Sequence, residues 1–191
     1  MFDVSIFNVT KEGLFASEKE SFPIGNGDLG ANVWMDQNEV LNVLLSKTDS
    51  ISEATRLLKI GLVQIRFDRP LFSDNNCAKS VLDLRDGTVT VTNQDESVCI
   101  QIAAFRNRPL YGIRMKSKMP IKMTAKPVIW RTEERIIDKE DDSCGLQRAV
   151  FPIAESADVL EDECTWYHHN IWSYANYTLR NQQMQNLNDY V

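Results

Sequence analysis

The stretch Ser21-Phe-Pro-Ile-Gly-Asn-Gly-Asp-Leu-Gly-Ala-Asn-Val-Trp34 decides the fold class, because its glycines have the spacing of a known binding loop. The spacing is G-x-G-x-x-G, formed by Gly25, Gly27 and Gly30. An aspartate, Asp49, lies 19 residues after the last glycine and completes the fingerprint of a dinucleotide-binding loop. Such a loop requires a helix directly after the last glycine, because the helix N-terminus receives the phosphate.

The residues after the glycines predict a strand instead of a helix. Their apolar members occupy alternate positions, which is the period of a β-strand: Ala31, Val33 and Met35. A phosphate bound at this point would find no helix N-terminus. We therefore interpret Pro23–Gly27 as a turn that leads into a strand, with glycines that supply conformational freedom and let the backbone pack closely.

The same alternation recurs along the chain and predicts an antiparallel β-protein. Apolar residues alternate with polar ones in three further segments: 63–67, 98–104 and 121–125. Between Val81 and Thr92 an Asp86-Gly87 pair separates two alternating runs, which indicates a hairpin closed by a type I′ turn. One face of each sheet would be solvated and the other buried. We expect a mainly β fold, an antiparallel β-sandwich.

Two segments interrupt this pattern and predict helix. Ser50-Ile-Ser-Glu53 has the spacing of a capping box, and Arg56–Gly61 could form one or two helical turns that end at glycine. Trp172–Leu187 lacks Gly and Pro and predicts a C-terminal helix. The charged stretch Glu133–Asp142 is typical of an exposed loop. No internal boundary is visible, so residues 1–191 are expected to form a single domain.

Composition excludes several classes of partner. A net charge of −6 and a pI near 5.0 argue against nucleic acid and against an anionic membrane surface. No apolar run approaches the ~18 residues needed to span a bilayer, and Met1–Phe7 has no feature of a signal peptide. The four cysteines have no metal-binding spacing; they are interpreted as small buried residues, with a disulfide left open. We expect no metal and no cofactor.

The candidate binding residues lie in two places. Aromatic and amide side chains suited to a sugar, or equally to a core strand or a domain interface, cluster near the C-terminus: Trp166, His168, His169, Asn170 and Trp172. In the glycine stretch, Asn26 and Asp28 are candidates, although a turn explains both. Lys47 could form an ion pair with Asp28 or Asp49 and hold the glycine loop in place. We expect no catalytic residue among them.

Several motifs in order resemble a bacterial domain-of-unknown-function family, number 5703. They are Ser21–Trp34, Leu45-Ser-Lys-Thr-Asp49, Arg56–Gly61, Leu82–Gly87, Ile129-Trp-Arg131 and Trp166-Tyr-His-His-Asn170. The Pro-Ile-Gly-Asn-Gly-x-Leu-Gly-Ala segment is also similar to the N-terminal domain of glycoside hydrolase family 95, the α-L-fucosidase and α-L-galactosidase group. Ser50-Ile51 departs from the pattern, in which an aromatic residue often follows Lys-Thr-Asp.

The resemblance implies an N-terminal β-sandwich of the supersandwich type in a periplasmic or secreted protein. In such enzymes a helical barrel follows and carries the catalytic acid and base, so no catalytic residue carries over to this chain. The chain would then be an incomplete, non-catalytic domain whose partner is the barrel or a second copy. A free-standing carbohydrate-binding module that binds an oligosaccharide is the alternative, and a hydrolase in its own right is a third reading.

Overall fold

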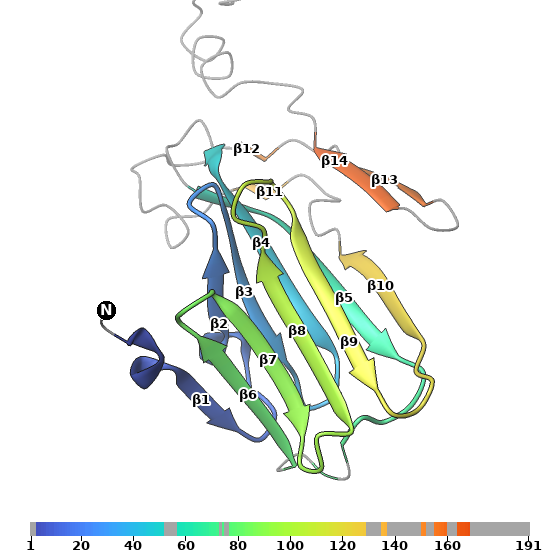
Figure 1. Cartoon of the computed structure of the whole chain (residues 1–191). Helices are drawn as coiled ribbons and strands as arrows, with labels where there is room; N and C mark the ends of the chain where they lie inside the picture. Colours follow the sequence, from blue (N-terminus) through green and yellow to red (C-terminus); the bar gives the residue numbers. More distant parts are fainter. Residues whose placement is uncertain are drawn as a thin grey trace, which may run out of the picture. The chain divides into compact units, whose positions relative to one another are not determined.

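The computed structural model describes residues 3–51, 57–72, 74, 77–128, 135–136, 150–151, 155–159 and 164–168. The chain forms two compact units. The large unit comprises Met1–Ser50 and Leu58–Val128, and the second unit comprises Ile51–Leu57 and Ile129–Val191. Figure 1 shows the strands of both units.

The first sheet contains the glycine stretch. Its five strands lie in the order β10-β5-β4-β3-β2. Their bounds are Phe22–Gly25 for β2, Leu29–Met35 for β3, Leu41–Ile51 for β4, Leu57–Phe67 for β5 and Met123–Val128 for β10. The pairs β2–β3, β3–β4 and β5–β10 are antiparallel, as the sequence predicts.

The second sheet is also antiparallel and lies in the order β1-β6-β7-β8-β9. Its strands are Val9–Glu12 for β1, Ala78–Asp83 for β6, Thr88–Asn93 for β7, Val98–Ala104 for β8 and Tyr111–Ser117 for β9. Two short 3-10 helices, η1 at Val4–Phe7 and η2 at Glu18–Glu20, flank β1.

The two sheets face each other and share one hydrophobic core (Figure 1). β2 contacts β7 and β8 of the opposite sheet. Burial alternates along β3, where Val33 and Met35 have no exposed surface, and along β8, where Ile100 and Ile102 have none. Since alternate residues of a strand lie on opposite faces, this pattern places one face of each sheet in the core. The predicted mainly β sandwich is confirmed.

The predicted hairpin at Asp86-Gly87 is confirmed, but its turn differs from the prediction. The register pairs Asp83 with Thr88, which leaves a four-residue loop. Gly87 has a φ of 70°, and its N–H donates to the Asp83 carbonyl oxygen at 2.9 Å. A type I′ turn needs positive φ at both central residues, and Asp86 does not have it. Carboxylate bonds to Arg85 and Thr88 N–H close the longer loop instead.

The short helix predicted at Arg56–Gly61 is wrong. β4 continues through Ser50 to Ile51, and β5 begins at Leu57, so residues 57–61 are extended. These residues belong to the long strand β5, which lies beside β4, whereas β10 pairs only with the later residues 62–67. Pairing of this kind outweighs a weak local helix signal. Residues 52–56, the centre of the capping-box motif, lie outside the described residues.

The last strand of the first sheet also departs from the prediction of one buried face. β10 pairs with β5, so Met123 and Ala125 lie on the same face as Phe67 and Ile65. Ile65 is buried, whereas Met123 and Ala125 are both exposed. β10 is an edge strand, and the core does not extend over it.

In the second unit, backbone pairing defines two short ladders. β11 (Arg135–Ile136) pairs with β12 (Val150–Phe151), and β13 (Glu155–Val159) pairs with β14 (Cys164–His168). β11 interrupts the loop predicted at 133–142, whose other residues are not described. The C-terminal helix predicted over 172–187 lies outside the described residues as well.

A buried hydroxyl in the core gives a first prediction. Ser80 on β6 is 1% exposed, and its Oγ has no hydrogen-bond partner in the part of the chain that the structure describes. An unsatisfied buried polar group costs about 1–3 kcal/mol. We expect Ser80→Ala to raise the free energy of unfolding by about 1 kcal/mol, measured by urea denaturation.

The matched control is Ser46→Ala, since Ser46 Oγ donates to the Gly30 carbonyl oxygen at 3.0 Å. Loss of that bond should lower the free energy of unfolding by about 1 kcal/mol. A Ser80→Ala protein as destabilised as the control would contradict the prediction.

Candidate functional site

The turn between β2 and β3 depends on its glycines for steric reasons. Gly27 has a φ of 94°, a conformation that residues with a side chain rarely adopt. A Cβ atom on Gly25 would lie 2.7 Å from the carbonyl oxygen of Leu29, which is too close. The predicted roles of these glycines, conformational freedom and close backbone packing, are confirmed.

All the hydrogen-bonding groups of the Asn26 side chain are engaged within the large unit. Its Oδ1 accepts from the N–H groups of Asp28 at 3.0 Å and Leu29 at 2.7 Å. Its Nδ2 donates to the carbonyl oxygens of Phe105 at 2.7 Å and Arg108 at 3.1 Å. Phe105 and Arg108 belong to the loop between β8 and β9 in the second sheet, so Asn26 joins the two sheets at one end.

Asp28 extends this contact along its own sheet. Its Oδ1 accepts from Thr48 Oγ1 at 3.1 Å and lies 3.4 Å from Lys47 Nζ, while its carbonyl oxygen accepts from Thr48 N–H at 2.9 Å. Lys47 also pairs with Asp49. The hydrogen bond to Asp49 first, and then that to Asp28, raise the pKa of Lys47, while Lys47 lowers the pKa of Asp49. The predicted ion pair of Lys47 with one of the two aspartates is confirmed, and the structure forms it with both.

Tyr111, at the start of β9, has a pKa that the charge of Asp28 in this cluster affects. Its hydroxyl is buried and has no hydrogen-bond partner among the described residues. Burial, and to a smaller extent the negative charge of Asp28, raise the pKa of Tyr111 to about 12. The phenol therefore stays neutral at physiological pH.

This arrangement cannot serve as a dinucleotide site. A phosphate-binding loop offers free backbone N–H groups at the start of a helix. Here the N–H groups of Asp28 and Leu29 are bonded to Asn26, and β3 follows the turn. Asp28 and Asp49 share one lysine, Lys47. The arrangement is that of a structural clamp, which we call the glycine-loop clamp (Asn26, Asp28, Lys47 and Thr48).

The other predicted binding residues are only partly within the described chain. Trp166 and His168 occupy alternate positions of β14, opposite Ala157 and Glu155 of β13. Alternate positions share a face of a strand. His169, Asn170 and Trp172 lie outside the described residues. Asn26 and Asp28 belong to the large unit, whereas Trp166 and His168 belong to the second.

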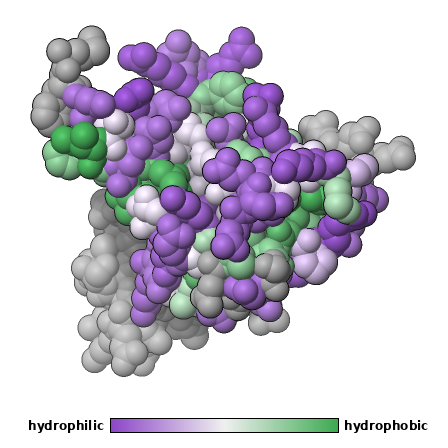
Figure 2. Space-filling view, turned by 60° about the horizontal axis from the view of Figure 1, so that its bottom comes forward, coloured by the Kyte–Doolittle hydropathy of each residue, from purple (hydrophilic) through white to green (hydrophobic). Residues whose placement is uncertain are grey.

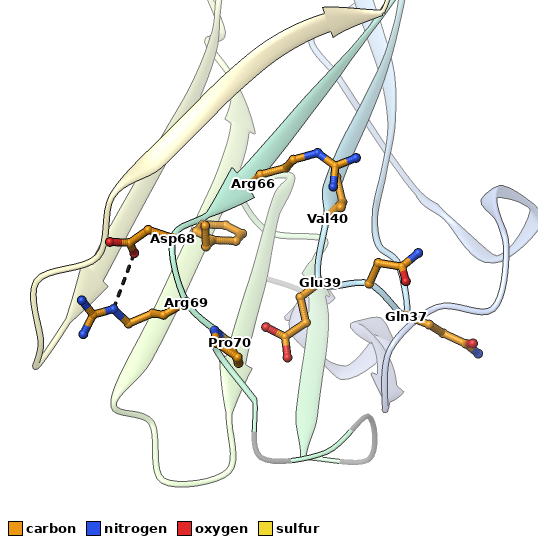
Figure 3. A pocket seen from close by; sticks show the side chains of 9 residues that line it. Gln37, Glu39, Val40, Arg66, Asp68, Arg69 and Pro70 are labelled. Atoms are coloured by element: carbon orange, nitrogen blue, oxygen red, sulfur yellow. Dashed lines mark ion pairs between the residues drawn. The ribbon is translucent and has the colours of Figure 1, made fainter.

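At the opposite end of the sandwich lies a pocket that the sequence did not predict. It encloses about 450 Å³ between the β3–β4 turn and the end of β5 (Figure 3). We call it the turn pocket; its lining residues are Gln37, Asn38, Glu39, Val40, Arg66, Phe67, Asp68, Arg69 and Pro70. Figure 2 brings this end of the molecule forward and shows that hydrophilic side chains cover most of it.

The β3–β4 side of the pocket is built around Asp36. Its Oδ1 accepts from the N–H groups of Asn38 at 2.9 Å and Val40 at 3.1 Å, and its Oδ2 accepts from Asn42 Nδ2 at 3.1 Å. These bonds hold Glu39 at a φ of 56°, which is uncommon for a residue with a long side chain. The turn is therefore closed by one carboxylate rather than by a glycine.

Two acidic side chains hold the chain after β5: Glu39 joins it to the β3–β4 turn, and Asp68 joins it to the segment before β10. Glu39 Oε2 accepts from the N–H of Leu71 at 2.6 Å. Asp68 Oδ1 accepts from the N–H of Lys122 at 3.1 Å and lies 3.5 Å from Arg69 Nε. Arg66, also in the lining, has no ion pair within the described part of the chain. The pocket thus carries two guanidinium groups and two carboxylates.

A weak signal for this pocket is present in the sequence. Polar and charged residues follow two neighbouring strands, at Asp36–Glu39 and at Arg66–Arg69. The ends of β3 and β5 lie at the same end of the sheet, on either side of β4, because the residues at both ends line one pocket. Neither run forms a known motif, so only the strand order brings them together.

The described residues contain no cluster of three or more His, Cys, Asp or Glu side chains that could hold a metal ion. They also contain no helix long and apolar enough to cross a membrane.

The clamp predicts a specific loss of stability. In Asn26→Asp, a carboxylate would face the carbonyl oxygens of Phe105 and Arg108, and both donated bonds would be lost. At about 1 kcal/mol for each bond, with added repulsion, we expect the free energy of unfolding to fall by about 2–3 kcal/mol in guanidinium denaturation.

Asn38→Asp, in the exposed β3–β4 turn, is the control for the same chemical change and should stay within about 0.5 kcal/mol of the wild type. Equal effects of the two substitutions would show that Asn26 is not a clamp.

The raised pKa of Tyr111 predicts that the protein becomes less stable as the pH rises into the alkaline range. Its pKa is about 12 in the folded chain, against about 10 for an unfolded tyrosine. Folding therefore favours the neutral phenol, so this contribution is complete below pH 10 and is lost as the pH rises from 10 through 12. We expect the urea midpoint of the wild type to fall more steeply over this range than that of Tyr111→Phe. Parallel curves for the two proteins would contradict the assignment.

Comparison with known proteins gives one family. The model of a family described as "Domain of unknown function (DUF5703)" matches residues 14–191. No curated protein matches the chain.

Proposed function

Because the chain belongs to the DUF5703 family as one of its N-terminal domains, we propose that it is a non-catalytic β-sandwich domain of a bacterial carbohydrate-active protein. In this role it packs against a catalytic domain, not present in residues 1–191, and shapes one wall of the substrate cleft. The similarity of Pro23–Ala31 to the N-terminal supersandwich domain of glycoside hydrolase family 95 supports this proposal. The same similarity favours a periplasmic or secreted protein.

The observation that carries the proposal is the nature of the glycine-loop end. Polar side chains at this end, such as Asn26 and Asp28, already form hydrogen bonds within the protein, so few are left to bind a substrate or to take part in catalysis. Beside them, in the β8–β9 loop, two large apolar side chains are exposed, Phe105 at 52% and Leu110 at 49%. A rigid end with exposed apolar side chains is typical of a surface that packs against another domain.

The path of the chain agrees with this choice of surface. The chain leaves the large unit after Ser50, returns at Leu58 and leaves again after Val128. The register Leu29↔Lys47 places the end of β4 beside the glycine loop, and β5 starts and β10 ends at that same end of the sheet. The strand ends that lead out of the sandwich therefore lie at the glycine-loop end.

A second candidate is a free-standing carbohydrate-binding module. It is favoured by the presence of Trp166 and His168 at alternate positions of β14, since an aromatic ring can stack on a sugar and an imidazole can bond to its hydroxyls. Binding on a glycan array that His168→Ala abolishes would favour this candidate. No binding to any sugar would count against it.

The packing surface predicts self-association of the 191-residue chain, because exposed apolar surface is buried by a second copy when its natural partner is missing. Leu110→Ser should shift the monomer–dimer equilibrium toward monomer by about tenfold in sedimentation experiments. Met119→Ser, which changes a side chain that is 59% exposed in the β9–β10 connection at the other end, should have little effect.

A wild-type chain that stays monomeric at high concentration would contradict this prediction. Sequencing the gene beyond Val191 tests the proposed function directly: a frame that continues for several hundred residues with helical periodicity supports it, and a stop codon there contradicts it. Hydrolysis of aryl glycosides by the purified chain would also contradict a non-catalytic role.

A further inference from the structure

We propose that the turn pocket binds a neutral, polyhydroxylated ligand of the size of one or two sugar rings. The pocket lies at the opposite end of the sandwich from the glycine-loop clamp, so it is separate from the packing surface proposed above. Its volume of about 450 Å³ falls within the range of about 300–1,000 Å³ that is usual for small-molecule sites.

The charges in the pocket favour a neutral ligand. Arg66 and Arg69 are matched by Glu39 and Asp68, so the lining has no net charge. An anion would meet two carboxylates, and a cation would meet two guanidinium groups. Neither ion could use all the charged groups of the lining, because each would complement one pair and be repelled by the other.

The hydrogen-bonding groups favour hydroxyls in particular. Glu39 uses one oxygen, Oε2, to hold Leu71 N–H, and Asp68 uses Oδ1 for Lys122 N–H and Arg69. Their second oxygens have acceptor capacity, and the guanidinium of Arg66 offers several donors. A hydroxyl group donates and accepts at once, so neighbouring hydroxyls of a sugar can complement a lining that holds both kinds of group.

The remaining lining supplies an apolar surface. Phe67 and Pro70 lie among the charged groups and are not buried, and C–H faces of a sugar ring can pack against such side chains. Figure 3 shows Glu39 directed toward Pro70, Arg66 lying across β4 near Val40, and the Asp68–Arg69 ion pair on the far flank. Glu39 and Arg66 therefore lie on the side of the β3–β4 turn and β4, whereas the paired Asp68 and Arg69 side chains extend away from them.

The pocket is also held in shape before any ligand arrives. Asp36 fixes the β3–β4 turn, and the bond from Leu71 N–H fixes the carboxylate of Glu39 in spite of the positive φ of that residue. Backbone conformations of this kind persist where the surrounding structure imposes them, and they concentrate at ligand sites. A preformed site loses less entropy when it binds.

The experiment is chemical-shift mapping on the ¹⁵N-labelled 191-residue chain. The probes are the methyl glycosides of D-galactose, D-glucose, D-xylose and L-fucose at millimolar concentration, with D-glucuronate and inorganic phosphate as anionic comparisons. We expect at least one neutral glycoside to shift the amide signals of Asn38–Val40 and Arg66–Arg69. Arg66→Ala should weaken that binding by about tenfold or more, because a hydrogen bond from a charged donor is lost.

Two further variants keep the test independent of folding. Glu39→Gln retains an acceptor for Leu71 N–H and should weaken binding while the unfolding midpoint stays near that of the wild type. Arg114→Ala, on β9 of the other sheet, changes an exposed arginine outside the pocket and should leave binding unchanged.

Absence of shifts with every neutral glycoside, or shifts confined to other residues, would overturn the proposal. Tighter binding of phosphate or glucuronate at the same amides would also overturn it, since it would identify an anion site. The choice of a sugar as the ligand rests on the proposed function. The experiments nevertheless distinguish a failure of the proposed packing role from a failure of the proposed binding site. A chain that binds sugar here while its reading frame stops at Val191 would contradict the packing role alone, and a continuing frame without sugar binding would contradict the pocket alone.

Discussion

The side-chain amide of Asn26 is the interaction on which one end of the sandwich depends. It binds two N–H groups of its own turn and two carbonyl oxygens of the facing sheet, and so it closes the turn and joins the sheets together. The amide can reach both only because Gly27 adopts a positive φ and Gly25 has no Cβ atom to collide with Leu29. The same turn places the Asp28 carboxylate beside Lys47 and Thr48. A motif that looks like a phosphate loop is therefore a clamp whose donors are already used.

The two ends of the sandwich are built on different physical principles. At the glycine-loop end, polar groups are satisfied internally and apolar side chains such as Leu110 are exposed, which suits contact with another domain. At the other end, carboxylates such as Asp36 and Glu39 hold the backbone while charged and amide groups stay exposed around the turn pocket. The first end suits contact with another folded domain, and the second suits a small polar ligand. The hydrophobic core, which includes Met35 and Ile100, lies between them.

Alternating hydrophobicity predicted strands such as β3 and β8, because burial of one sheet face imposes the period that they display. It did not predict β1, β4 or β9. Local signals failed where long-range pairing decided the outcome, as at Arg56–Gly61, where residues 57–61 form the start of β5. The role of Asn26 could not be predicted, since its partner Phe105 lies 79 residues away along the chain. The turn pocket was missed for the same reason, because its two sides meet only through the strand order.

The central claim is that the glycine motif is an internal clamp and not a ligand site. Hydrogen–deuterium exchange at individual amides, followed by NMR with and without added NAD⁺, tests it most directly. We expect the N–H groups of Asp28 and Leu29 to exchange as slowly as those of the neighbouring strands, because both donate to Asn26, and we expect NAD⁺ to leave the rates unchanged. Fast exchange at these two amides, or protection that appears only with the nucleotide, would contradict the clamp.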